Sequence, residues 1–126
     1  MKTYLAAAAV LVGVVAGGVA VQGPRAQTKV PVYYVVEVDV TDPLGYEKEY
    51  LSQARELIRS HGGRLLAAGD PTLVVGDPPK SRVAVYVWDD MDQLRRWFSS
   101  PAFQDLRRTG QRYARFRNYA VAGTAP

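Results

Sequence analysis

The strictest pattern in the sequence is the stretch YYVVEVDV, residues 33–40, together with the Asp-Pro pair that follows it. Valine recurs at every second position from Val36 to Val40, which is the period of a strand that buries one face. Asp42 and Pro43 are typical of the N-cap and the first position of a helix. We therefore expect the chain to pass from a half-buried strand directly into a helix.

The other face of this strand carries two carboxylates, Glu37 and Asp39. Carboxylates two residues apart on a strand share a face, so they could act as general acid and base. They could equally be the acidic half of a charge-paired surface, since opposite charges on neighbouring strands help to fix register. We interpret them mainly in the second sense, with catalysis as the alternative.

A helix is predicted after Pro43, and Gly62-Gly63 is typical of the left-handed turn that ends one. Its apolar residues recur with helical spacing, which indicates packing by one stripe. The stripe consists of Tyr50, Leu51, Ala54, Leu57 and Ile58.

Three further strands and two helical segments are expected after this turn. The first of these strands is followed by TLVV, a candidate extension, and by the turn GDPPK. Asp90 and Ser100-Pro101 mark the starts of the two helical segments. The predicted strands are 63–69, 81–90 and 114–123, and the predicted helical segments are 90–99 and 100–113.

This order of elements predicts an α+β fold of the ferredoxin-like βαββαβ type with an antiparallel four-stranded sheet. Right-handed crossovers would place both helical layers on one face of the sheet. Alternation assigns large aromatic and charged side chains to the other face, which exposes more apolar area than a soluble monomer usually does. A second copy packed face to face would cover it and close a dimeric α/β barrel, so we expect a homodimer. The dimer-face candidates are Tyr33, Glu37, Asp39, Arg82, Tyr86, Arg115, Arg117 and Tyr119, with Val35, Trp88 and Val121 assigned to the same face.

Composition sets the remaining bounds. A chain of 126 residues, 48% hydrophobic and 22% charged, suits a single folded domain. The formal charge of +4 includes Lys2 and Arg25 of a segment that we expect to be removed, so it gives little argument for a nucleic-acid partner. Cysteine is absent, which excludes disulfides and thiolate metal sites.

Residues 1–26 have the layout of a signal peptide, with Lys2 followed by an uncharged run from Thr3 to Gly23. We predict export to the bacterial periplasm or beyond, and the cleavage point is left open. The alternative is a membrane anchor that is not cleaved, because an apolar run of about 18 residues approaches the length that spans a bilayer. Residues 27–31 are then a linker, residues 32–123 form the dimeric α/β-barrel domain, and no other membrane contact is expected.

The stretches quoted above, taken together, resemble the bacterial family catalogued as domain of unknown function 1330. The resemblance covers nearly all of residues 32–123 and rests on the order and spacing of Asp-Pro-x-x-Tyr, Gly-Gly-Arg, Gly-Asp-x-Pro and Trp-Phe-x-Ser-Pro-x-Phe. It implies membership of the dimeric α/β-barrel superfamily, which includes cofactor-free monooxygenases acting on aromatic substrates, isomerases and haem proteins. It therefore implies a cavity without a defined chemistry. Glutamate often precedes the glycine that matches Gly76 in this family, whereas this chain has Val75.

The residues that could line such a cavity include the only histidine, His61, which shares a helical face with Glu47 and the apolar stripe. The alternative is that both residues only offset the helix dipole at the two helix ends. No metal-ligand spacing is recognisable, so we predict neither a metal nor another cofactor. The ligand-pocket candidates are Tyr46, Glu47, His61, Arg64, Trp88, Trp97, Phe103 and Arg112, of which the aromatic members also suit a core.

Two functional hypotheses follow. The first is an exported homodimer that binds a small apolar or anionic molecule between helices and sheet, with Arg64, Arg82 or Arg112 as anion partners. The second is a cofactor-free monooxygenase or isomerase acting on a small aromatic or enolisable compound, with His61 as a weak catalytic candidate. A structural protein without a ligand is a third reading, and the sequence names neither a substrate nor a reaction. The helical arginines lie close to acidic residues, as on solvated helix faces, which argues against a nucleic-acid partner.

Overall fold

The structure is a computed structural model that describes residues 29–124. The predicted signal peptide and the start of the predicted linker lie outside the described residues, as do residues 125 and 126. The elements are β1 (Val32–Val40), α2 (Pro43–Tyr46), the π-helical segment η1 (Glu47–Leu51), α3 (Ser52–Ser60), β2 (Arg64–Gly69), β3 (Arg82–Trp88), α4 (Met91–Phe98), α5 (Pro101–Gly110) and β4 (Ala114–Ala122).

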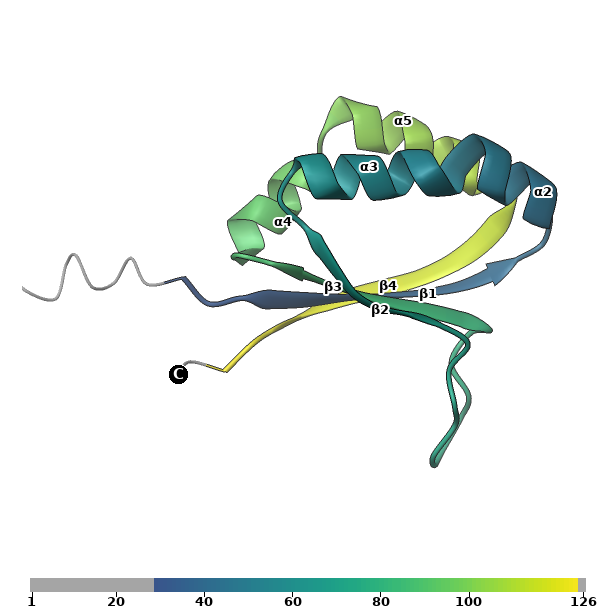
Figure 1. Ribbon diagram of the computed structural model, residues 1–126, viewed down its shortest axis with the longest axis horizontal. Coiled ribbons are helices and arrows are strands. Elements are labelled where there is room, and N and C mark those ends of the chain that lie inside the picture. Colours follow the sequence, from purple (N-terminus) through teal and green to yellow (C-terminus); the bar gives the residue numbers. More distant parts are fainter. Residues whose placement is uncertain (1–28, 125–126) are drawn as a thin grey trace, which may run out of the picture.

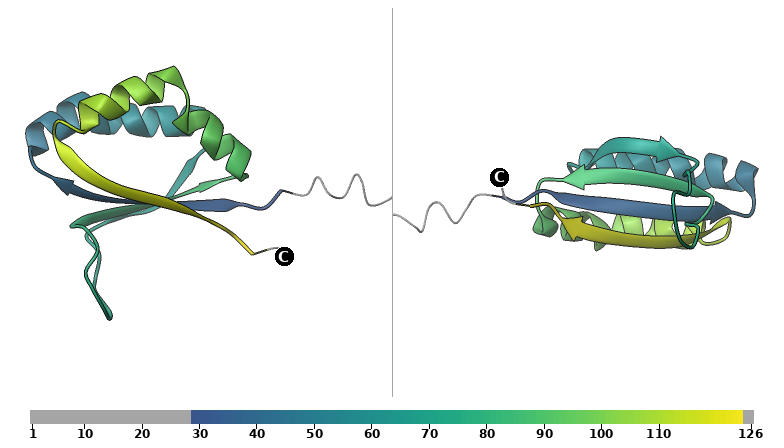
Figure 2. Two further views of the ribbon diagram at one scale, coloured as in Figure 1. Left: turned by 180° about the vertical axis from the view of Figure 1, so that it is seen from behind. Right: turned by 90° about the horizontal axis from the view of Figure 1, so that it is seen from below.

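The four strands form one antiparallel sheet in the order β2-β3-β1-β4. All helices cover the same face of this sheet, and no element of the described residues covers the opposite face, which we call the open face (Figure 1, Figure 2). The α+β ferredoxin-like βαββαβ prediction is confirmed, and β1 lies in the middle of the sheet between β3 and β4.

The helices α2, α4 and α5 begin where the sequence predicts, because each of these three has an N-cap side chain. Asp42 accepts a hydrogen bond from the Gly45 N–H at 3.1 Å, and the hydroxyl of Ser100 accepts one from Phe103 at 3.2 Å. Asp90 caps α4 in the same way. Gly62 has a φ of 102°, a conformation that only glycine adopts without strain, and α3 ends just before it.

The π-helical segment η1 is the one feature of the first helix that the sequence pattern did not predict. A π segment inserts an extra residue into a helical turn and is frequently found at functional sites. Here it joins α2 to α3 and carries Tyr50, which is buried together with Tyr46 just before it.

The core lies between the helices and the sheet and is built mainly from aromatic rings. Trp97 is at its centre, with ring centroids 4.2 Å from Phe103, 5.2 Å from Trp88 and 5.4 Å from Tyr34. The Tyr34 contact is edge-to-face, an arrangement that the ring quadrupoles favour. A second cluster around Tyr50 fills the other end of the layer.

The assignment of β3 to its two faces was wrong. Residues opposite each other in register share a face, and the pairs are Val38 with Arg82, Tyr34 with Tyr86 and Val32 with Trp88. Arg82, Tyr86 and Trp88 therefore lie on the helix face and not among the dimer-face residues. The physical reason is that burying Tyr86 and Trp88 removes more apolar surface from water than burying three valines does. The open face consists of Tyr33, Val35, Glu37 and Asp39 of β1, Val83, Val85 and Val87 of β3, and Arg115, Arg117, Tyr119 and Val121 of β4.

Residues 70–81, between β2 and β3, form an irregular connection that we call the arm. TLVV at 72–75 does not extend β2, so that candidate extension is corrected. The strand does not continue there because Asp70-Pro71 interrupts the ladder, and proline has no N–H to donate to it. The arm instead leaves the sheet on the side of the open face (Figure 1).

Candidate functional site

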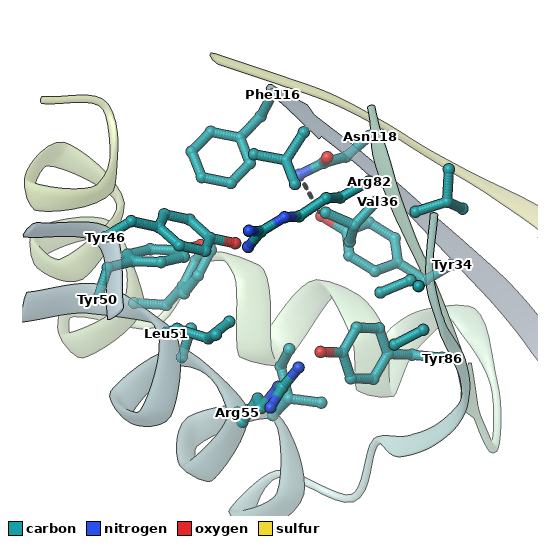
Figure 3. A pocket seen from close by; sticks show the side chains of 18 of the residues that line it. Tyr34, Val36, Tyr46, Tyr50, Leu51, Arg55, Arg82, Tyr86, Phe116 and Asn118 are labelled. Atoms are coloured by element: carbon teal, nitrogen blue, oxygen red, sulfur yellow. Dashed lines mark hydrogen bonds between the residues drawn. The ribbon is translucent and has the colours of Figure 1, made fainter. Parts of the chain in front are cut away.

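A cavity of about 360 Å³ lies between the first helix and the sheet. Its walls come from η1, α3, β1, β2 and β3, with contributions from α4, α5 and β4. Figure 3 shows its side chains converging from these elements. Its apolar and aromatic lining includes Tyr34, Val36, Val38, Tyr46, Tyr50, Leu51, Ala54, Ile58, Ala84, Tyr86, Trp97, Phe103 and Phe116.

Two arginines, Arg55 of α3 and Arg82 of β3, line this cavity from opposite walls (Figure 3). Both side chains remain accessible to solvent. Within residues 29–124 neither guanidinium forms an ion pair, although seven other arginines and lysines outside the cavity do so. Asp70 also lines this cavity, so the two guanidinium groups and this carboxylate leave one net positive charge beside the aromatic lining. Such an environment favours an anion with an apolar body.

Four tyrosines supply polar atoms to the cavity lining. Burial raises the pKa of Tyr34 to about 12, although a hydrogen bond from the Asn118 amide to its hydroxyl oxygen, 3.0 Å long, opposes the shift. Burial also raises the pKa of Tyr46, Tyr50 and Tyr86. All four hydroxyls therefore stay protonated at neutral pH, so they can donate hydrogen bonds but do not act as bases.

A second cavity of about 380 Å³ opens on the β4 side of the helix layer. Tyr50, Phe103, Phe116 and Asn118 line both cavities, so these side chains form the wall between them. The position of the Tyr50 ring therefore affects the shape of both spaces.

The predicted pocket residues separate into two groups. Tyr46, Trp97 and Phe103 line the main cavity. Trp88 is fully buried in the core behind Trp97 and does not line it.

The charged pocket candidates lie elsewhere. His61 is the C-cap of α3, and its Nδ1 is 2.8 Å from the carbonyl oxygen of Leu57, which matches the helix-end alternative. Glu47 is exposed on a shallow outer groove. Arg64 pairs with Asp89 at 3.3 Å, and Arg112 is exposed and lines none of the three cavities described.

Sequence reasoning missed Tyr34, Tyr50, Tyr86 and Arg55 as cavity residues. Tyr34 and Tyr50 were assigned to core-facing positions, and no cavity was expected beside them. Tyr86 was placed on the wrong face, and Arg55 was not considered. A usable signal existed, because Arg55 follows Ala54 of the apolar stripe and so stands at the edge of the buried face.

The carboxylates of the open face are held in a separate network. Glu37 is only 2% exposed and accepts hydrogen bonds from Arg117 at 2.8 and 3.0 Å, from the Tyr119 hydroxyl at 2.9 Å and from the Lys80 N–H at 3.1 Å. Its Arg117 hydrogen bond is the main reason that the pKa of Glu37 lies below its ordinary value. A carboxylate with this many donors stays ionised and is a poor general base, so the pairing interpretation is supported over catalysis.

Asp39 is paired in the same way but with the arm. It accepts a hydrogen bond from the Ser81 N–H at 2.8 Å and forms an ion pair with Lys80 at 3.3 Å. The backbone hydrogen bond of Ser81 is the largest cause that lowers the pKa of Asp39. Arg82 was expected to pair with these acids, and it does not because it lies on the other face.

The part of the chain that the structure describes contains no group of three metal-ligating residues. It also contains no helix long and apolar enough to cross a membrane.

Comparison with solved structures shows the same fold in proteins of low sequence identity. A protein of unknown function from Rhodopseudomonas palustris superposes with a TM-score of 0.63 at 13% identity, over 81% of this chain and 89% of that one. SnoaB, a cofactor-independent oxygenase from Streptomyces nogalater, gives 0.54 at 19% identity, over 77% of this chain and 96% of that one. A NIPSNAP-like domain protein from Burkholderia xenovorans gives 0.51 at 14% identity, over 79% and 89%.

At these identities the likeness concerns the fold alone, which is that of the dimeric α/β-barrel proteins. No curated protein matches the chain in sequence. A family model described as "Domain of unknown function (DUF1330)" matches residues 31–124, which is the whole folded domain apart from its first two described residues. The chain therefore belongs to the DUF1330 family.

Proposed function

We propose that this domain binds a small anionic molecule with an apolar, preferably aromatic, body in the cavity between its first helix and its sheet. The observation that carries the proposal is the pair Arg55 and Arg82, which lack ion-pair partners within residues 29–124 and line an aromatic cavity of about 360 Å³. A charge-assisted hydrogen bond to a guanidinium contributes about 1.5–3 kcal/mol. The aromatic lining would supply the rest of the affinity through burial of the ligand body.

The test compares two probes of the same shape and different charge, 2-naphthoate and 2-naphthamide, by calorimetry. Arg82→Met should weaken naphthoate binding about 10- to 100-fold and leave naphthamide binding nearly unchanged. Arg112→Met is the matched control, because Arg112 is exposed and lies outside the cavity. Equal binding of naphthoate to the wild type and to Arg82→Met contradicts the proposal, and so does the absence of binding across naphthoate, benzoate and octanoate.

A cofactor-free monooxygenase or isomerase is the second candidate. The same two guanidinium groups favour the ionised form of a phenol or enol, since an opposite charge nearby lowers its pKa. Such an anion is the form of the substrate that these reactions require. His61 is not available to accept the proton, because it caps α3 outside the cavity. Oxygen uptake with naphthols, measured for the wild type and for Arg82→Met, tests the monooxygenase, and its absence in the wild type contradicts that reaction.

The functional unit that we propose is a homodimer formed through the open face. Support comes from the four exposed or half-exposed valines and two tyrosines on that face, and from the dimeric barrels to which the fold neighbours belong. Apolar faces of this extent usually mark an interaction surface. Sedimentation analysis over a concentration series measures the association. A chain that is still monomeric at about 100 µM contradicts the proposed homodimer.

A further inference from the structure

The arm, residues 70–81, carries the most exposed apolar side chains of the described residues. Val74 and Val75 are 91% and 86% exposed, and Leu73 beside them is half exposed. Three consecutive apolar residues in water are unfavourable unless another surface covers them. The arm extends away from the sheet on the side of the open face (Figure 1, Figure 2), so the cover must also lie on that side.

The end of the arm nearest β3 is fixed to the sheet. Lys80 and Ser81 donate their backbone N–H groups to Glu37 and Asp39 at 3.1 and 2.8 Å, and the Lys80 ammonium pairs with Asp39. Glu37 is in turn held by Arg117. Through these contacts Glu37 and Asp39 attach the arm to the sheet, which is a structural role for both carboxylates.

The open face has a second apolar patch at its other end. The arm joins β3 at Arg82, which is opposite Val38 of β1. Tyr33, opposite Val121 of β4, lies five residues nearer the N-terminal end of β1. That separation is about 17 Å along the strand. Val121 is 57% exposed, and Tyr33 is also exposed.

This placement suits a two-fold dimer. In an isologous interface a residue i of one copy contacts residue j of the other, and j contacts i. When two open faces meet with their ends reversed, each arm lies over the Tyr33 and Val121 patch of the other copy. For each arm to reach the patch of the other copy in such a two-fold dimer, the arm and the patch must lie at opposite ends of the open face, as they do here.

The area of the sheet also favours participation of the arm. Four strands of up to nine residues give a flat footprint of roughly 30 by 19 Å, or about 570 Å². A stable interface usually buries about 800 Å² on each partner. A flat footprint is smaller than the accessible surface that it carries, so the sheet supplies most of an interface of this size, and an arm of twelve residues adds to it.

We propose that Leu73, Val74 and Val75 of each arm pack on the Tyr33 and Val121 patch of a second copy of this chain. The inference rests on the homodimer proposed above and adds that the arm of each copy contacts the partner. The arm begins at Asp70, which lines the ligand cavity together with Gly69, the last residue of β2, so the same segment touches the ligand site and the partner.

The absence of cysteine from the chain allows a site-specific test. A nitroxide label is attached to Val74→Cys, and to Leu44→Cys as the control, because Leu44 is 82% exposed on α2 in the helix layer. The label at 74 should become immobilised at concentrations where sedimentation shows a dimer and regain mobility on dilution. The label at 44 should stay mobile throughout.

Two further measurements locate the contact. The double variant Val74→Asp/Val75→Asp should raise the dimer dissociation constant at least tenfold, whereas Leu44→Asp should leave it unchanged. Val74→Cys combined with Val121→Cys should form a disulfide-linked dimer on mild oxidation, whereas Val74→Cys combined with Leu44→Cys should not. Because these side chains are exposed, the variants should fold normally, which circular dichroism checks.

The outcomes separate the two proposals. A dimer in which the label at 74 stays mobile and the double aspartate variant associates normally overturns the arm contact and leaves the sheet-face dimer intact. A chain that remains monomeric overturns both. A label at 74 that is immobile in the monomer means that the arm packs on its own chain, and this also overturns the inference.

Discussion

Replacing Gly110 by alanine should destabilise the domain through a single contact. Gly110 ends α5 and packs against the ring of Tyr50. A Cβ atom at this position would lie 2.6 Å from both Cδ1 and Cε1 of that ring, whereas ordinary contacts begin at 3.4 Å. Since packed interiors leave little free space, the ring must move by roughly 1 Å into one of the two cavities that it separates.

The expected loss of stability follows from two opposing contributions. Inserting a methyl group into a packed site costs about 1–3 kcal/mol. The better helix propensity of alanine returns at most about 1 kcal/mol, and less at a helix end. The net loss in the free energy of unfolding is therefore about 1–2 kcal/mol, which lowers the urea midpoint by about 1–2 M for a domain of this size.

Urea unfolding of Gly110→Ala, followed by tryptophan fluorescence, measures this loss. Tyr50→Leu removes the ring that the new methyl group meets, so Gly110→Ala should cost much less in that background. The two substitutions should then show a coupling energy of at least about 1 kcal/mol. An equal loss in both backgrounds, or no loss in the wild type, would refute the reasoning that the Tyr50 contact decides the effect.

Three other predictions concern the caps, the buried acid and the N-terminal segment. Asp42→Ala and Ser100→Ala should each lower the free energy of unfolding by about 1 kcal/mol in urea titrations, because each removes a helix N-cap; unchanged midpoints would contradict the capping geometry. Glu37 has a lowered pKa in the folded protein, so the stability it confers is present above its ordinary value of 4.5 and is lost as the pH falls through the folded value. Urea midpoints measured from pH 6 to pH 3 should therefore fall less steeply for Glu37→Gln than for the wild type, and parallel curves would contradict this. Residues 1–26 should be missing from the exported protein by intact-mass spectrometry, and a full-length chain in the membrane fraction would instead support the anchor alternative.

The architecture could be predicted from the sequence because several local signals agree. Asp42-Pro43, Asp90 and Ser100-Pro101 each begin a helix where they were expected to. Gly62 ends the first one with a positive φ. These signals act over three or four residues and do not depend on which strand lies next to which, and so they can be read without a structure.

The face assignment of β3 depends on its neighbours, and there local reasoning failed. The strand alternates between a face of valines and a face with Arg82, Tyr86 and Trp88, and either set could point to a core. Period-two alternation defines two faces but does not say which one is buried, and a one-residue change of phase exchanges them. The comparison of buried area, which favours Tyr86 and Trp88, would have decided correctly.

The unknown face assignment of β3 also explains why the site could be predicted only in part. Tyr46, Trp97 and Phe103 were identified because they are bulky residues on apolar helix faces. Arg82 was predicted on the dimer face and was also named as a possible anion partner, and its register with Val38 places it on the cavity side. An arginine on the inner face of a sheet is costly to leave there without a counter-charge, and Arg82 avoids part of that cost by keeping access to solvent beside the cavity. Once the register is known, the charge that looked like part of the dimer surface becomes the strongest indication of what the cavity holds.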